Sequence, residues 1–177
     1  EQIHRCRTRQ WRQQLTPRLT LDVDGTLVDS AAIVEQVMRK WCHENDVSFS
    51  DLQDSTHSSR TEDTVGSVAP HLDPKREAEK IEAMELEALG HLKEIKGASS
   101  FLFQVPEKRW AVATSSSSLS AKAKLEAVRM AIPTVLIGAD RVQNGKPPPE
   151  AYLTASMDLG CDCRDCLAFE DSETGVR

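Results

Sequence analysis

Several features are absent from this sequence, and each absence excludes a class of protein. No stretch approaches the roughly 18 apolar residues that a membrane-spanning helix needs, so we expect no membrane partner. Acidic residues outnumber basic ones by 28 to 22, and the formal net charge of −6 argues against a nucleic-acid partner. The chain of 177 residues is also too short for a second full domain beside one ordinary core.

We expect no secretory leader, although the sequence contains five cysteines. An odd number of cysteines cannot pair completely within one chain, and free thiols are typical of a reducing compartment, so we expect a cytoplasmic protein. Three of the cysteines lie in the segment CDCRDC at residues 161–166, which could form a soft-metal or redox cluster. Because no fourth ligand follows at the usual spacing and Cys166 opens an apolar stretch, we favour ordinary thiols.

What is present is the composition of a globular protein, with 39% apolar and 28% charged residues. The start of the chain is an exception, because its first 18 residues contain five arginines and show no apolar period. We expect residues 1–18 to form a basic, disordered arm.

The first half of the remaining sequence predicts one strand and two helices. Residues 19–24 alternate between apolar and polar side chains and stop at a glycine, which indicates a strand that runs into a loop. Apolar residues recur at helical spacing over residues 30–41. A polar, loop-like stretch at residues 47–64 separates this helix from a second one, which starts at an Asp-Pro pair and carries an apolar stripe over residues 73–95.

The second half alternates between strand and helix patterns. Residues 110–114 form an apolar strand, and four serines lead from it into a helix at residues 119–130. An apolar stretch at residues 135–137, a helix after Pro149 and a strand at residues 166–169 continue the alternation. This order predicts an α/β fold, with a Rossmann-like parallel sheet covered by helices on both faces.

Polar residues follow the apolar residues of three predicted strands, namely Asp22, Thr114 and the pair Glu170-Asp171. Ligands of parallel sheets bind beyond the carboxyl ends of the strands, so we expect these side chains to converge. Asp22 and Asp24, two residues apart on an extended segment, lie on the same side of it. One carboxylate can then attack a phosphorus atom while the other gives a proton to the leaving oxygen.

Other residues could supply what phosphoryl transfer still needs. The oxygen-rich pair Glu170 and Asp171 favours Mg²⁺ as the cofactor. The hydroxyl of Thr114, the backbone N–H groups that begin at Ser115, and the charge of Lys146 could hold the phosphoryl oxygens. Paired aspartates before a glycine are common in turns, and lysines before prolines are common on surfaces. Only the combination of these features favours a catalytic site.

The segments LDVDGTLVDS, WAVATSSSS, GKPPPEAY and LAFEDSETGVR resemble, in order and spacing, the four motifs of phosphatases of the haloacid dehalogenase superfamily. The resemblance covers residues 19–177. It implies that Asp22 is the nucleophile and that Asp24 is the general acid and base. It also implies that Thr114 and Lys146 bind the transferring phosphoryl group. The implied ligands of Mg²⁺ are Asp22, Asp24 through its main-chain carbonyl, Glu170 and Asp171.

The resemblance further implies a helical cap of the C1 type, inserted at residues 30–95, over a core made of residues 19–29 and 96–177. Within the superfamily the chain looks most like phosphatases of glycerol phosphate, 2-deoxyglucose 6-phosphate and other sugar phosphates. The implied activity is Mg²⁺-dependent hydrolysis of a small phosphorylated metabolite, a sugar or polyol phosphate. His57 and Arg60 are the implied cap residues for substrate contact.

The sequence departs from the family pattern at two serines and at its end. Ser116 and Ser58 stand where these relatives usually carry glycine, and a left-handed backbone at either position would strain the loop and weaken catalysis. The sequence ends at Arg177, within the fourth motif and before the helix that this motif should open has room to form. We therefore expect a core that lacks its outer strand and exposes the strand at residues 166–169.

Alternative functions remain open on the same residues. A phosphomutase would pass the phosphoryl group from Asp22 to a second hydroxyl instead of to water. A catalytically impaired, truncated relative would bind phosphorylated ligands without turnover. Dehalogenation is not favoured, because it does not need the proton transfer that Asp24 provides.

Overall fold

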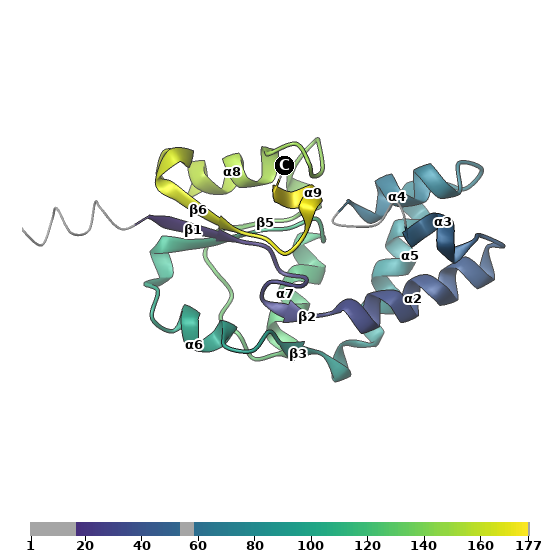
Figure 1. The fold of residues 1–177 in the computed structure, drawn as a ribbon, viewed down its shortest axis with the longest axis horizontal. Coiled ribbons are helices and arrows are strands. Elements are labelled where there is room, and N and C mark those ends of the chain that lie inside the picture. Colours follow the sequence, from purple (N-terminus) through teal and green to yellow (C-terminus); the bar gives the residue numbers. More distant parts are fainter. Residues whose placement is uncertain (1–16, 54–58, 177) are drawn as a thin grey trace, which may run out of the picture.

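The computed structural model of the chain describes residues 17–53 and 59–176. The predicted arm lies outside the described residues except for its last two positions, and so do His57 and Ser58. Figure 1 shows a sheet layered with helices and, to its right, a group of helices from α2 to α5 that we call the helical unit. None of the described helices is long and apolar enough to cross a membrane.

Four strands form one parallel sheet. They are β1 (Arg18–Leu21), β4 (Trp110–Ala113), β5 (Leu136–Ile137) and β6 (Cys166–Phe169), and their order across the sheet is β5-β4-β1-β6. Every neighbouring pair is parallel, as predicted. β1 lies between β4 and β6, so the residues that follow it lie in the middle of the carboxyl edge, where parallel sheets bind ligands.

Helices cover both faces of this sheet, as predicted. In Figure 1, α6 (Ala98–Leu102) and α7 (Ser118–Ala127) lie below the sheet and α8 (Glu150–Asp158) lies above it. Because neighbouring side chains of a strand point to opposite faces, β4 contributes to two apolar clusters. The cluster beside α6 and α7 includes Leu19, Leu21, Trp110, Val112 and Leu125. The cluster beside α8 includes Ala111, Ala113, Ile137, Ala151 and Ala155.

The helical unit has an apolar core of its own. Its helices are α2 (Ala31–Glu44), α3 (Phe49–Gln53), α4 (Thr61–Val68) and α5 (Pro74–Glu87). α5 begins where the sequence predicts, because the Asp73 side chain accepts hydrogen bonds from the backbone N–H groups of its first turn. The buried members of the unit's core include Val37, Met38, Trp41, Leu52, Val65 and Ile81.

Two predictions about this unit are wrong. The segment at residues 47–64 is not a loop throughout, since it contains α3 and the start of α4. These short helices are fixed by the packing of buried Leu52 and Val65, which local sequence preference does not reveal. The second predicted helix ends at Glu87 instead of Ile95. Ile95 packs against the apolar cluster of the sheet and not within the helical unit.

A small antiparallel pair of strands marks where the chain enters and leaves the helical unit. β2 (Val28–Asp29) pairs with β3 (Lys93–Glu94), and the 3-10 helix η1 (Leu89–His91) precedes β3. Next to the pair, the Ile95 N–H donates to the Leu27 carbonyl at 2.9 Å. Strands of two residues carry no readable period, so the sequence does not predict them. The pairing of β2 with β3 and the hydrogen bond from Ile95 to Leu27 hold the entering and leaving segments side by side.

β6 is an edge strand and is exposed along most of its length. Leu167 is 51% exposed and Phe169 is 38% exposed, which agrees with the exposure expected for this strand. The helix α9 (Glu173–Val176) follows the acidic pair that ends β6. The remaining 3-10 helices are η2 (Glu107–Arg109), η3 (Ala139–Arg141) and η4 (Cys163–Asp165).

Candidate active site

Three strand ends bring polar side chains together at the carboxyl edge of the sheet. Asp22 follows β1, Thr114 follows β4 and Glu170 follows β6. Backbone hydrogen bonds continue the strand register past these ends. The N–H of Asp22 donates to the Phe169 carbonyl, and the N–H of Thr114 donates to the Ile137 carbonyl, each at 3.0 Å. The register of the sheet therefore fixes the backbone from which these side chains project.

A cavity of about 380 Å³ opens at this edge, and both the sheet and the helical unit line it. Its lining from the sheet side includes Asp22, Asp24, Thr114, Ser115, Lys146 and Asp171. Its lining from the helical unit and the segment before α4 includes Val34, Met38, Phe49, Ser59 and Thr61. The sheet wall is thus charged, and the other wall is mainly apolar with hydroxyl groups and two glutamates, Glu35 and Glu85. Such a cavity suits a small molecule with an anionic end that faces Lys146.

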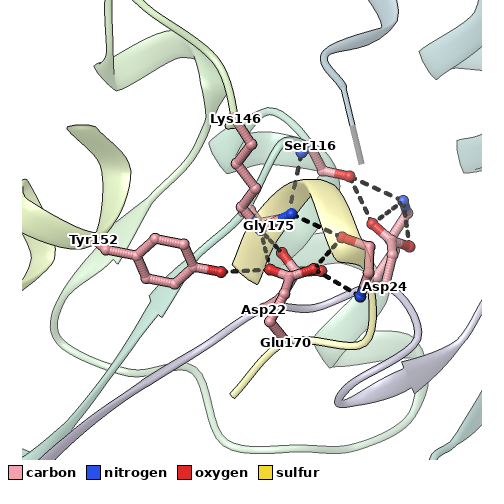
Figure 2. Close-up of polar contacts among 10 residues, drawn as sticks. Asp22, Asp24, Ser116, Lys146, Tyr152, Glu170 and Gly175 are labelled. Carbon is pink, nitrogen blue, oxygen red and sulfur yellow. Dashed lines mark hydrogen bonds and ion pairs between the residues drawn. The ribbon is translucent and has the colours of Figure 1, made fainter. Parts of the chain in front are cut away.

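Lys146 connects two carboxylates from different strands. Its ammonium lies 2.9 Å from Asp22 Oδ1 and 2.6 Å from Glu170 Oε2, and its side chain is almost fully buried. Figure 2 shows this side chain reaching down between the two acids, with Tyr152 pointing at Glu170 from the other side. The Tyr152 hydroxyl donates to the same Glu170 oxygen that accepts from Lys146. Glu170 is therefore held from both sides.

The two carboxyls that contact Lys146 have pKa values shifted in opposite directions. Burial raises the pKa of Asp22 to about 7, and the nearby Glu170 and Asp24 add to the increase although Lys146 opposes it. Burial would also raise the pKa of Glu170, but hydrogen bonds from Lys146, Tyr152 and Ser172 bring it below its ordinary value. One lysine does not fully offset the negative charge around Asp22, which leaves a place for a further cation.

The acidic groups of the site fit a Mg²⁺ ion. Carboxylate oxygens of Asp22, Glu170 and Asp171 lie within 4.8 Å of one another, and such all-oxygen ligand sets favour Mg²⁺ over softer metals. Two glycines allow this approach, because a Cβ at Gly25 would overlap the side chain of Asp171 and a Cβ at Gly175 would overlap that of Glu170. Gly25 also has a φ of +75, a backbone conformation that favours glycine.

Asp24 lies in a separate hydrogen-bond network. Its carboxylate accepts from Ser30 Oγ at 2.5 Å, from Ser116 Oγ at 2.8 Å and from the Lys124 ammonium at 2.8 and 3.0 Å. Burial would raise the pKa of this carboxyl, but Lys124 and the two serine hydroxyls bring it below its ordinary value. Asp22 and Asp24 are therefore held by different lysines, and the pKa is raised for Asp22 and lowered for Asp24.

The concern about Ser116 does not arise in this structure. The described non-glycine residues with positive φ are Asp46 and Arg129, so Ser116 does not have the strained backbone. Its hydroxyl donates to Asp24, and its N–H donates to Thr114 Oγ1 at 3.2 Å. A serine here adds a hydrogen bond that glycine could not make.

Of the two implied cap residues, His57 lies outside the described residues and Arg60 lies next to the cavity rather than in its lining. Arg60 forms an ion pair with Asp63 at 2.7 Å and donates to the Gln143 carbonyl at 3.1 Å. Its flanking residues Ser59 and Thr61 do line the cavity. Arg60 therefore fastens the segment before α4 to the loop that leads to Lys146.

Three residues of the site were not identified from the sequence, namely Ser30, Lys124 and Tyr152. The helical spacing could have identified Lys124, because it lies three residues after Ala121 and one before Leu125, on the buried face of α7. A lysine on an apolar stripe needs a buried partner. Tyr152 lies within the third quoted motif, but its role depends on a contact with Glu170, 18 residues away.

The cysteine-rich segment does not form a metal site among the residues that the structure describes, since only Asp22, Glu170 and Asp171 meet the ligand geometry there. Cys161 and Cys166 are in contact, with 3.3 Å between their sulfur atoms, and Cys163 is exposed. All three are free thiols.

The carboxyl edge of the parallel sheet thus gathers carboxylates and buried lysines, an arrangement that suits an enzyme with a carboxylate-centred active site. The chain belongs to the haloacid dehalogenase-like hydrolase family, whose model matches residues 19–177. This match confirms the predicted family.

The relatives of this chain include phosphatases. Over 166 residues the chain is 31% identical to hexitol phosphatase A of Escherichia coli (strain K12). This match covers 88% of this chain and 74% of that protein. Over 184 residues it is 29% identical to 2-deoxyglucose-6-phosphate phosphatase 1 of Saccharomyces cerevisiae, covering 88% and 72% of the two proteins. The predicted enzyme class, a phosphatase of this family, is confirmed by these relatives.

The fold is also found in a solved structure of more distant sequence. The crystal structure of a beta-phosphoglucomutase from Clostridium difficile superposes with a TM-score of 0.79 at 18% sequence identity, covering 90% of this chain and 78% of that chain. At this identity the likeness establishes the fold alone. It confirms the predicted α/β architecture.

Proposed function

We propose that the protein hydrolyses a small sugar or polyol phosphate in a Mg²⁺-dependent reaction through a phospho-aspartate on Asp22. The observation that carries this proposal is the position of the Asp22 carboxylate. It lies buried at the end of the central strand β1, 2.9 Å from the Lys146 ammonium and beside a second acidic group, on the wall of a cavity of about 380 Å³. Relatives named for hexitol and 2-deoxyglucose-6-phosphate support the substrate class.

The chain's own residues supply both steps. The Asp22 carboxylate attacks phosphorus and the bond from phosphorus to the substrate oxygen breaks. Asp24, which takes up a proton from solvent when the anionic phosphate binds beside it, gives this proton to that oxygen. Asp24 then takes a proton from a water molecule, which attacks the phosphoryl group and releases inorganic phosphate from Asp22. Thr114, Ser115 and Lys146 line the same cavity and would hold the phosphoryl oxygens in both steps.

The metal site would consist of the side chains of Asp22, Glu170 and Asp171 together with the main-chain carbonyl of Asp24. When bound, Mg²⁺ would offset the negative charge between these carboxylates and the phosphate. Lys146 contributes to the same end, because it already carries one positive charge between Asp22 and Glu170.

We further propose that residues 30–95 are the cap and that they select the substrate. In support, the helical unit supplies the apolar and hydroxyl-bearing wall of the cavity, opposite the charged wall from the sheet. The remote part of a substrate would lie against this wall. Arg60 would act by holding Ser59 and Thr61 in place, and His57 remains a proposed contact. The free thiols support the proposed cytoplasmic location.

The proposal is tested by measuring phosphate release from hexitol phosphates, 2-deoxyglucose 6-phosphate and glycerol phosphate, with Mg²⁺ and with a chelator. We expect release that depends on Mg²⁺ and differs between substrates. Transfer of the phosphoryl group to another hydroxyl of the sugar, without net release, would instead identify a phosphomutase. Binding without either reaction would identify an impaired relative.

A further inference from the structure

Lys124 connects the helical unit to Asp24. It lies on α7, and its side chain is 3% exposed. Its ammonium is 2.8 and 3.0 Å from the two oxygens of Asp24, 3.2 Å from Glu85 Oε2 on α5, and 3.1 Å from Ser116 Oγ. The lysine therefore lies between the proposed proton-transfer group and a helix of the proposed cap.

A lysine at this position is costly unless its charge is offset. Its neighbours on the same face of α7 are the fully buried Ala121 and Leu125, so an apolar residue would suit the packing. Burying an ammonium group without partners costs several kcal/mol. Here two carboxylates offset it, and they come from different parts of the molecule, Asp24 from the sheet and Glu85 from α5.

Lys124 also fixes the direction of the Asp24 carboxylate. A carboxylate has about four acceptor positions, and four donor contacts reach Asp24. Ser30 contacts Oδ1 and Ser116 contacts Oδ2, while Lys124 contacts both oxygens. Only Lys124 reaches both oxygens among the described residues, so it determines the rotation of the carboxylate plane more than either serine does.

A second contact of the same helices strengthens the link. Glu82 lies one turn before Glu85 on α5, and it accepts a hydrogen bond from Ser117, which caps α7. The side chain of Glu85 is 10% exposed, so little water competes for its contact with Lys124. A displacement of α5 would therefore act directly on the ammonium that orients Asp24.

We propose that Lys124 is a positioning residue that couples the placement of the cap to proton transfer by Asp24, with Glu85 as its partner on the cap. This inference rests on the proposed phosphatase activity. It adds that the cap acts on the chemical step through one buried lysine, as well as on substrate choice.

The test compares two substrates with different leaving groups. An alkyl phosphate such as a hexitol phosphate needs a proton on its leaving oxygen, whereas p-nitrophenyl phosphate needs little help. The quantity to compare is kcat/KM, which reports on the steps through formation of phospho-Asp22 and not on its hydrolysis. Lys124→Met should lower kcat/KM for the alkyl phosphate by about 10²-fold and for the aryl phosphate by less than about 10-fold. The matched control is Lys122→Met, an exposed lysine on the same helix.

A double-mutant cycle tests the role of Glu85. Glu85→Gln should lower the ratio of alkyl to aryl kcat/KM several-fold, less than Lys124→Met does, because Lys124 keeps its contact with Asp24. In the Lys124→Met background the same change should have little further effect on that ratio. Glu87→Gln, an exposed position on α5, is the control. If Lys124→Met does not fold, Glu85→Gln against Glu87→Gln decides the matter alone.

The outcomes separate the two proposals. An inactive wild-type enzyme would contradict the proposed function. Suppose that the wild-type enzyme is active, but Lys124→Met lowers kcat/KM equally for both substrates, or Glu85→Gln leaves the ratio of alkyl to aryl kcat/KM unchanged. Either result would overturn the coupling and leave the phosphatase proposal standing.

Discussion

The two walls of the cavity differ in chemistry and in how they are held. The wall from the sheet carries the charged groups Asp22, Lys146 and Asp171, and strand register fixes its backbone. The wall from the helical unit is formed mainly by apolar and hydroxyl-bearing residues such as Val34, Phe49 and Thr61. Charged groups that must hold a phosphate need fixed positions, whereas a wall that selects among substrates needs shape.

The difference extends to stability. The helical unit has its own apolar cluster, so it is held together independently of the sheet. Its polar links to the rest of the described chain include Lys124–Glu85, Ser117–Glu82 and Arg60–Gln143. Substitutions on the sheet wall should therefore stop the reaction, and substitutions on the helical wall should change its selectivity.

The largest effect is expected for Asp22→Asn. An amide cannot form the acyl phosphate, so turnover of every substrate should be lost. Phosphate release by the purified variant measures this, with the exposed Asp165→Asn as the control. Release at a near wild-type rate would remove Asp22 from the role of nucleophile.

Chelation should have a similarly large but reversible effect. Asp22, Glu170 and Asp171 lie close together around a single lysine, and an anionic substrate adds further negative charge. We expect a chelator to stop phosphate release and added Mg²⁺ to restore it. Full activity in excess chelator would contradict the proposed metal site.

A smaller effect is expected for Asp24→Asn. The loss of a general acid and base should lower kcat for an alkyl phosphate by about 10²–10⁴-fold. The protein should remain folded, because Asn can still accept some of the hydrogen bonds from Ser30, Ser116 and Lys124. The unfolding temperature of the variant serves as the control for folding. An unchanged rate would show that Asp24 transfers no proton.

On the helical wall, Arg60→Ala should alter selectivity more than chemistry. Without its bond to the Gln143 carbonyl, the segment that carries Ser59 and Thr61 loses its attachment to the sheet side. The preference among sugar phosphates should change several-fold, while hydrolysis of p-nitrophenyl phosphate changes less. Arg76→Ala, an exposed arginine of α5, is the control. Equal losses of activity on all substrates would show that Arg60 acts on the chemical step and not on substrate choice.

The smallest effect concerns stability without metal. Because burial raises the pKa of Asp22 to about 7, the folded state binds a proton that the unfolded state releases near pH 4. The contribution of Asp22 to stability therefore falls as pH rises from about 4 to about 7. In chelator, Asp22→Asn should raise the unfolding temperature at pH 8 by about 2–4 °C or more, and by less at pH 5. A lower unfolding temperature at pH 8 would show that the ion pair with Lys146 outweighs burial.

The same contrast explains how much the sequence could predict. The strands and their terminal residues Asp22, Thr114 and Glu170 were predictable, because apolar runs end there in polar groups and parallel strands meet at one edge. The helical unit was predicted less well. α3, α4 and the early end of α5 depend on packing between helices, which local periodicity does not contain.

Within the site, the missed residues act through distant partners. Lys124 contacts Asp24 across 100 residues, and Tyr152 contacts Glu170 across 18. A sequence can indicate that a buried lysine needs a carboxylate, but only the fold shows which one. Ser116 illustrates the same limit, because its departure from glycine suggested strain and its hydroxyl instead donates to Asp24.

The central claim is that the sheet wall performs the chemistry through a phosphoryl group on Asp22. Asp24→Asn should accumulate this intermediate, because p-nitrophenyl phosphate can still phosphorylate Asp22 while no base assists its hydrolysis. After acid quenching, mass spectrometry should find one phosphoryl group on the peptide that contains Asp22, in amounts approaching one per chain, and none in the presence of chelator. Release of p-nitrophenol with no phosphorylated peptide, or with the phosphoryl group on another residue, would contradict the account.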